Sequence, residues 1–157
     1  MSKEHDEKII ETTQKIMDFM KIQAGVSIQE NDLGEDKIKI VNIEAPTESG
    51  ALIGKNGQTI QSLEHVIRLI AKKGVELEAN FIIDVNNYRK SRVDYLVNYA
   101  RGVAAEVKNT HRAKALFPMP AHERRIVHME LAAHGELETE SVGEEPRRRI
   151  VIRKISI

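Results

Sequence analysis

Cysteine is absent from the 157-residue sequence, and aromatic residues make up only 4% of it. The absence of cysteine excludes a disulfide framework, thiolate metal sites and a cysteine nucleophile, and it fits a reducing compartment. No apolar run approaches the length of a membrane span, and residues 1–8 are too polar for a signal peptide. We therefore expect a cytoplasmic protein that does not enter the membrane.

Charge is balanced over the whole chain but not along it. The net charge is zero, yet residues 1–86 carry 10 basic and 15 acidic side chains, whereas residues 87–157 carry 14 and 9. Hydrophobic residues, at 41%, suffice for a packed core, and the length suits one ordinary domain or two small ones. The asymmetry favours two units, the second suited to an anionic partner. Solvated faces arising by chance would give the same imbalance.

Hydrophobic periodicity predicts the order helix–strand–strand–helix–helix–strand for the first half. A helix over 5–24, whose apolar stripe includes Met20, stops at Gly25. Strands at 26–30 and 37–44 flank a polar turn at 31–36, and the alternation in the second strand buries Ile38 and Ile40 rather than Lys37 and Lys39. A helical turn at 48–54 precedes a helix over 58–72 that Lys73 and Gly74 end. A strand follows at 81–85, after Ala79 and Asn80. The stripe of the 58–72 helix consists of Ile60, Leu63, Ile67 and Ile70.

The second half begins with the strongest helical pattern, over 89–109. An extended piece at 115–117 precedes a helix over 120–134, which Pro120 suits as its first residue. The buried side of this helix is expected to carry Ile126, Met129 and Ala133. Two strands, at 137–142 and 148–155, close the chain.

Two glycines three positions apart, Gly54 and Gly57, separate two helices of the first half. Glycine lets the backbone turn sharply and approach a partner closely. The N-terminus of the following helix favours phosphate, and Lys55 and Asn56 add a cation and a hydrogen-bond donor. An ordinary turn between helices would contain the same glycines. A P-loop is excluded, because only three residues separate Gly50 from Gly54 and Asn56 stands where Ser or Thr would hold magnesium.

With this loop in this order of elements, residues 5–86 resemble a KH domain of the bacterial arrangement, which has an extra helix at the front. The resemblance implies that Gly54, Lys55, Asn56 and Gly57 clamp the backbone of four nucleotides. It also implies that Ile53, part of the following helix and the 81–85 strand line an apolar groove for bases. The low aromatic content disfavours modules that stack bases on exposed aromatic side chains, which KH grooves do not require.

A second candidate site is formed by Arg124 and His128, which are four residues apart and therefore share a helix face. Arg124 can offer a planar fork to phosphate, and His128 can hydrogen-bond phosphate or base. A surface arginine and a packed histidine would show the same spacing. If the helix packs on the following strands, nearby residues join the pair in one cationic surface: Arg89, Lys90, Arg92, Arg125, Arg147, Arg148 and Arg149. Alternatively, the triple arginine at residues 147–149 is neutralised by acidic side chains, namely Glu138, Glu140, Glu144 and Glu145.

The second half is similar to the R-three-H domain, named for its Arg-x-x-x-His signature, which binds single-stranded nucleic acid. The similarity rests on the strings at residues 87–92, 116–119, 123–128, 138–141 and 143–149. Together the two halves resemble the Jag family, also called KhpB, EloR or SpoIIIJ-associated protein. Many members begin with a further small domain and a linker that this sequence lacks. The sequence leaves open whether roles that depend on that domain, such as recruitment near a membrane, apply to this chain.

Catalysis and metal binding lack a recognisable pattern. His122 and His128 are six residues apart, which places them about 240° apart around a helix rather than on one face. Glu130 and His134 share a face, but two ligands do not make a metal site. We expect no catalytic residue, no metal site and no cofactor.

We predict an α+β protein of two small tandem units, a KH-type unit at 1–86 and an R-three-H-type unit at 87–157, that binds single-stranded RNA. The resemblance implies a bacterial RNA chaperone or post-transcriptional regulator linked to cell elongation or sporulation. It also implies pairing with a small stand-alone KH protein, and a dimer of the chain with itself is an alternative. Two other functions stay open, namely an interaction adaptor that uses the KH fold as a scaffold and binding of single-stranded DNA.

Overall fold

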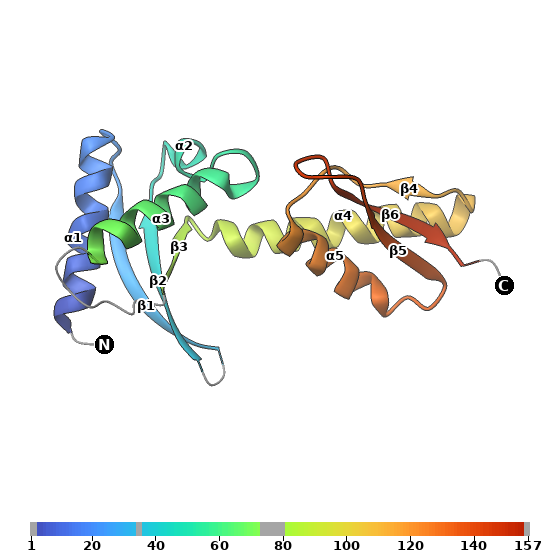
Figure 1. Ribbon diagram of the computed structural model, residues 1–157, viewed down its shortest axis with the longest axis horizontal. Coiled ribbons are helices and arrows are strands. Elements are labelled where there is room, and N and C mark those ends of the chain that lie inside the picture. Colours follow the sequence, from blue (N-terminus) through green and yellow to red (C-terminus); the bar gives the residue numbers. More distant parts are fainter. Residues whose placement is uncertain (1–2, 34–35, 73–80, 156–157) are drawn as a thin grey trace. The chain divides into compact units, whose positions relative to one another are not determined.

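The computed structural model describes residues 3–33, 36–72 and 81–155. The chain divides into two compact units, Met1–Arg89 and Lys90–Ile157, and a separate hydrophobic core lies in each of them. Each unit combines helices with a three-stranded sheet (Figure 1). The predicted α+β class is therefore confirmed.

The first unit has the predicted order helix–strand–strand–helix–helix–strand (Figure 1). A short 3-10 helix, η1, lies between its last two helices. The turn predicted at 31–36 is shorter than expected, because residues 31–33 belong to β1 and residue 36 to β2. Residues 34–35, the predicted helix end at Lys73 and Gly74, and the boundary at Ala79 and Asn80 lie outside the described residues. The elements are α1 Lys3–Phe19, β1 Gly25–Leu33, β2 Asp36–Glu44, α2 Ser49–Ile53, η1 Lys55–Gly57, α3 Gln58–Lys72 and β3 Phe81–Val85.

The sheet of this unit has the strand order β1-β2-β3. β1 and β2 pair antiparallel, whereas β2 and β3 pair parallel with Lys39 opposite Phe81 and Ile43 opposite Val85. Parallel strands need a crossover connection, and this crossover contains α2, η1 and α3. Helices α1 and α3 contact each other, and they contact β1 and β3 respectively. The loop before α3 is thereby tied to the sheet through α3.

Strand β2 has the opposite alternation to the one predicted. Ile43 is fully buried, and Lys39, in phase with it, is only 6% exposed. Ile38 and Ile40 are only partly buried. Lys39 is accommodated because its ammonium lies 2.5 Å from a carboxylate oxygen of Asp6 in α1, and a buried charge requires such a partner.

Helix α1 ends at Phe19, earlier than the predicted residue 24, and Met20 is exposed rather than part of the apolar stripe. Lys21 has φ 59°, which ends the helix. The chain turns back so that the Ile22 N–H donates to the Met17 carbonyl at 3.0 Å. Ile22 is consequently the residue that packs into the core here.

The stripe of α3 is confirmed at three of its four predicted positions, which are Ile60, Leu63 and Ile67. Ile70 is 46% exposed, and Ala71 is buried in its place. With the helical period, Ala71 lies about 20° around the helix from Ile60, whereas Ile70 lies about 80° from it. Ala71 therefore shares the buried face of Ile60, and Ile70 lies at its border.

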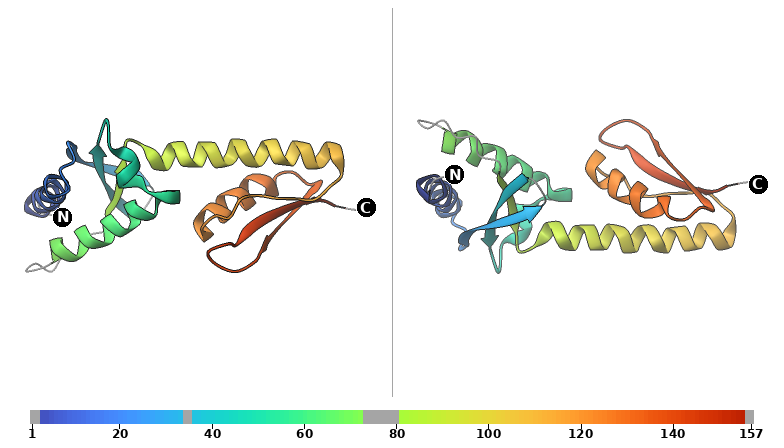
Figure 2. Two further views of the ribbon diagram at one scale, coloured as in Figure 1. Left: turned by 90° about the horizontal axis from the view of Figure 1, so that it is seen from above. Right: turned by 90° about the horizontal axis from the view of Figure 1, so that it is seen from below.

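The second unit contains most of one long helix, a shorter helix and three strands. They are α4 Tyr88–Thr110, which begins at the end of the first unit, β4 Lys114–Ala115, α5 Ala121–Ala132, β5 Leu137–Val142 and β6 Arg149–Lys154. The sheet has the order β4-β6-β5 with antiparallel pairing. In both views of Figure 2, α5 and the β5–β6 hairpin lie on the same side of α4. The face of α4 that enters the core consists of Leu96, Ala100, Ala104 and Val107.

The buried face of α5 differs from the prediction. Met129 is 67% exposed, Ala133 is exposed and Ile126 is only partly buried. The helix instead buries Glu123, Arg124, Val127 and Leu131. The helix can turn this face to the interior because the two charged side chains, Glu123 and Arg124, are paired within the second unit, as described below.

We expect Ile67→Ala to lower the free energy of unfolding by about 2–5 kcal/mol, because it removes a fully buried side chain and leaves a cavity. Ile70→Ala on the same helix is the matched control, and it should cost less than about 1 kcal/mol because the side chain is half exposed. Urea unfolding followed by circular dichroism measures both values. Equal losses for the two variants would contradict the burial pattern of α3.

Candidate nucleic-acid interface

The loop between α2 and α3 has a backbone conformation that suits glycine. α2 ends where the Gly54 N–H donates to the Gly50 carbonyl at 2.9 Å. Gly54 has φ 68° and Gly57 has φ 76°. Asn56, with φ 52° and ψ 31°, lies in the left-handed region, which asparagine adopts more readily than most residues. Local geometry therefore dictates residue type at three of the four loop positions.

Neighbouring atoms also restrict the two glycine positions. A Cβ at Gly54 would lie 2.0 Å from Oγ1 of Thr59, which is a severe clash. A Cβ at Gly57 would lie 3.1 Å from Cε1 of Tyr88, which is a tight contact. The loop backbone thus packs directly on α3 and on the start of α4.

The loop is also electropositive. α3 begins at Gln58, directly after η1. The N–H groups of Gly57 and Gln58 donate to the carbonyls of Gly54 and Lys55, and the positive end of the α3 dipole faces the loop. The Lys55 side chain is exposed, whereas Ile53 and Asn56 are partly buried. Ile53 packs against the core of the unit. A phosphate at this loop would meet the helix N-terminus and a mobile cation together.

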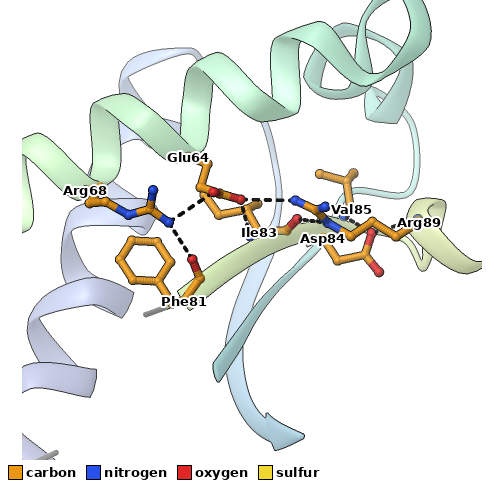
Figure 3. A network of polar contacts seen from close by, with 7 residues as sticks. All are labelled: Glu64, Arg68, Phe81, Ile83, Asp84, Val85 and Arg89. Atoms are coloured by element: carbon orange, nitrogen blue, oxygen red, sulfur yellow. Dashed lines mark hydrogen bonds and ion pairs between the residues drawn. The ribbon is translucent and has the colours of Figure 1, made fainter. Parts of the chain in front are cut away.

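Charged side chains from α3 and α4 cover the open hydrogen-bonding edge of strand β3 (Figure 3). Glu64 accepts the Ile83 N–H at 3.1 Å. Arg68 donates to the Phe81 carbonyl at 2.7 Å, and Arg89 Nε donates to the Ile83 carbonyl at 2.8 Å. The Glu64 carboxylate also binds both guanidinium groups, each at 3.0 Å. This network fixes α3 against β3, the two elements that are predicted to line a groove for bases.

Arg89, a predicted RNA contact, therefore has a structural role as well. Its backbone N–H donates to Asp84 at 3.1 Å, and its side chain stays partly exposed. Glu64 and Arg68 were not among the predicted site residues. Their spacing of four on one helix predicts an ion pair, but it does not indicate that the pair binds the edge of a strand.

Arg124 and His128 share a face of α5, as their spacing predicts, and this face is turned toward β5 and the β5–β6 turn. The Arg124 side chain is 8% exposed. Its Nη1 donates to the Met119 carbonyl and to the Glu145 carboxylate, both at 2.7 Å. His128 Nδ1 lies 2.7 Å from Thr139 Oγ1. A phosphate that binds this arginine must consequently displace the carboxylate of Glu145.

Burial lowers the pKa of His128 below its ordinary value of about 6.5, and the positive charge of Arg124 lowers it further. The imidazole is therefore neutral at pH 7. Because one ring nitrogen contacts Thr139, His128 offers its other nitrogen for hydrogen bonding and adds no charge to the site.

Arg92, a further predicted contact, is held by a buried carboxylate. Its guanidinium donates two hydrogen bonds to Glu123, at 2.8 and 3.0 Å. Glu123 is almost completely buried and lies next to Arg124 in the sequence. Two adjacent residues of α5 therefore each bind a residue of opposite charge from another part of the second unit.

The other predicted arginines are exposed, namely Arg125, Arg147, Arg148 and Arg149. Arg148 donates to Ser141 Oγ across the hairpin at 2.9 Å. Glu145 pairs with Arg124, and Glu140 pairs with Arg153. In the part of the chain that the structure describes, no ion pair joins the acidic residues to the triple arginine. Its positive charge is thus available at the surface of the second unit.

Residues 3–33, 36–72 and 81–155 contain no group of three or more His, Asp or Glu side chains placed to hold a metal ion. None of the helices described there is both long and apolar enough to cross a membrane.

The chain is similar to known proteins along most of its length. Residues 94–154 match the R-three-H domain family. The chain is 35% identical to RNA-binding protein KhpB of Clostridium symbiosum over 146 residues, which cover 93% of this chain and 64% of that protein. The chain is 33% identical to RNA-binding protein KhpB of Bacillus subtilis over 142 residues, which cover 88% of this chain and 65% of that protein. The chain is 36% identical to RNA-binding protein KhpB of Lactiplantibacillus plantarum over 106 residues, which cover 68% of this chain and 33% of that protein. The chain spans less than two thirds of the length of each of these relatives.

We expect Gly54→Ala to destabilise the first unit by about 1–3 kcal/mol, because the new Cβ meets Thr59 and the residue keeps a positive φ. Gly50→Ala is the matched control. It lies in α2 with open space around its Cβ position, and alanine favours helix. Thermal unfolding measures both variants. The loop conformation described above is wrong if Gly54→Ala is as stable as Gly50→Ala.

The lowered pKa of His128 makes stability depend on pH in a defined direction. The unfolded chain takes up a proton at this residue more readily than the folded chain, so the free energy of unfolding falls as the pH drops below about 6.5. We expect His128→Gln to reduce this loss between pH 7.5 and 5.5, which urea unfolding at a series of pH values measures. His65→Gln, at an exposed position of α3, is the matched control. An unchanged profile for His128→Gln would show that its burial has no energetic consequence.

Proposed function

We propose that the chain belongs to the Jag family and binds single-stranded RNA, because it is similar to KhpB proteins along most of its length and residues 94–154 match the R-three-H domain family. The observation that carries the proposal is the loop at residues 54–57. There, two glycines with positive φ bring the backbone up to the N-terminus of α3 beside the exposed Lys55.

In this proposal the loop grips the RNA backbone. Gly54 and Gly57 present no side chain, so that phosphates can approach the loop backbone and the positive end of the α3 dipole closely. Lys55 adds a charge-assisted contact, and Asn56 and Ile53 border the same loop. Bases would then extend toward α3 and β3, whose spacing is fixed by the network in Figure 3.

The second unit supplies further phosphate contacts. Its exposed arginines are Arg125, Arg147, Arg148 and Arg149. Arg124 joins them when a phosphate replaces Glu145, and the neutral His128 contributes a hydrogen bond to phosphate or base. Phosphate contacts position a strand and lengthen its footprint without specifying sequence, so base preference rests with the first unit.

The proposed action is binding without bond formation or cleavage, and the relatives, which are named RNA-binding proteins, support it. The proposal extends to a role as a cytoplasmic RNA chaperone or post-transcriptional regulator linked to cell elongation or sporulation. It also extends to a dimer of the chain with itself or with a small stand-alone KH protein.

We expect Lys55→Asp/Asn56→Asp to weaken binding of single-stranded RNA by at least about tenfold, because a charge-assisted contact is lost and negative charge faces phosphate. Fluorescence anisotropy with a mixed-sequence RNA pool, at low and near-physiological salt, measures the change. The slope of log affinity against log salt should fall by about 0.7 for each phosphate contact removed.

The matched control is Gln14→Asp/Lys15→Asp, which makes the same change in charge on α1. It should bind like the wild type. Arg124→Ala/His128→Ala, in the same assay, reports the share of the second unit. Equal affinity of all variants, or no binding by the wild type, would refute RNA recognition by these residues and favour the adaptor function. Competition with a DNA strand of matched sequence decides between the two nucleic acids.

A further inference from the structure

Three of the chain's six aromatic residues gather in one cluster of the second unit, although the sequence as a whole is poor in aromatics. Tyr95 and Tyr99 of α4 have nearly parallel rings, with an interplanar angle of 3° and centroids 6.1 Å apart. Phe117, from the segment between β4 and α5, stacks on Tyr99 with centroids 4.9 Å apart. It also stacks on Tyr95 at 6.4 Å. The three ring planes lie within 28° of one another.

Core packing explains two of these rings but not the third. Tyr99 and Phe117 are partly buried and pack against the hydrophobic core of the second unit. Tyr95 does not belong to that core and is 52% exposed. Its ring therefore extends the stacked cluster from the core to the solvent, and a planar aromatic surface at such a position is available to a ligand.

Arg92 adds a positioned cation to this cluster. Its guanidinium carbon lies 5.5 Å from the ring centroids of both Tyr95 and Phe117. The two hydrogen bonds to the buried Glu123 fix the guanidinium in this place. The charge of Arg92 is offset by Glu123, but its planar guanidinium remains beside the rings, and aromatic rings next to an arginine are a combination that proteins use to stack unpaired bases.

The position and charge of the cluster favour a nucleic-acid strand as its occupant. The second unit carries 13 basic and 9 acidic residues, so it attracts a polyanion. Phe117 is two residues from Met119, whose carbonyl binds Arg124, and Glu123, which holds Arg92, is next to Arg124. The cluster is thereby linked through two short segments to the Arg124–His128 site.

We infer that Tyr95, Tyr99, Phe117 and Arg92 form a stacking platform for a nucleobase of single-stranded RNA, with Tyr95 as the ring that contacts the base. The inference rests on the proposed RNA binding and assigns to the second unit a contact with bases in addition to its phosphate contacts. Every base has a flat aromatic face, so the platform adds affinity with little sequence preference.

The test compares a short fluorescein-labelled single-stranded RNA with the same strand in which abasic sites replace the bases. Tyr95→Ala should weaken binding of the first strand by about tenfold, the typical loss when one stacked base loses its aromatic partner. Its binding of the abasic strand should stay at the wild-type level. Tyr95→Phe keeps the ring and should bind both strands like the wild type. Phe19→Ala, which removes a ring that is 89% exposed in the first unit, is the matched control and should change neither affinity.

A second readout uses the intrinsic fluorescence of the protein, which comes from its three tyrosines because tryptophan is absent. The base-containing strand should quench this emission in the wild type and much less in Tyr95→Ala. If Tyr95→Ala binds both strands like the wild type, the platform is refuted while RNA binding stands, and the surface becomes a candidate contact for a protein. An equal loss for both strands also refutes it, because a backbone effect is not stacking. If the wild type binds neither strand, the proposed function itself fails and the platform with it.

Discussion

The carboxylate of Glu64 joins α3, which follows the two-glycine loop, to β3 and to the start of α4. It accepts a backbone N–H from β3, and it binds one arginine from its own helix and one from the start of α4. A carboxylate with little solvent exposure needs such donors to offset its lost hydration. The exposed edge of β3 needs partners for its polar groups as well. Because the same contacts satisfy both needs, α3 stands at a fixed place against the sheet, and the loop at its N-terminus is fixed with it.

In the second unit, buried charged side chains of helix α5 are likewise paired with groups of opposite charge. α5 turns Glu123 and Arg124 toward the interior, where Arg92 and Glu145 neutralise them. The arginine of the Arg-x-x-x-His signature is therefore first a structural residue that ties α5 to the segments before and after it. Its availability to phosphate depends on exchange with one exposed carboxylate. The exposed arginines of the β5–β6 hairpin do not need to exchange a carboxylate before they contact a phosphate.

The two units thus offer different chemistry to a polyanion. The first is acidic in its overall composition, and its proposed phosphate contacts lie where the loop backbone, the N-terminus of α3 and Lys55 meet. The second is basic, and it contains an aromatic cluster with Arg92 beside it. A strand bound by both would be held by backbone geometry in one unit and by side-chain charge and stacking in the other. This division agrees with the charge asymmetry along the sequence.

The sequence by itself determined the order of the elements, the loop at 54–57 and the shared face of Arg124 and His128. These features are local, because helical and strand periods, glycine backbone freedom and a spacing of four residues act within a few residues of the chain. Only the tertiary structure decided which face of β2 is buried, which face of α5 is buried and which arginines are held in ion pairs. Each of these depends on a partner distant in sequence, such as Asp6 for Lys39, 33 residues away, or Glu145 for Arg124, 21 residues away. The aromatic cluster belongs to the same class, because Phe117 meets Tyr95 and Tyr99 only when the chain after α4 folds back on that helix.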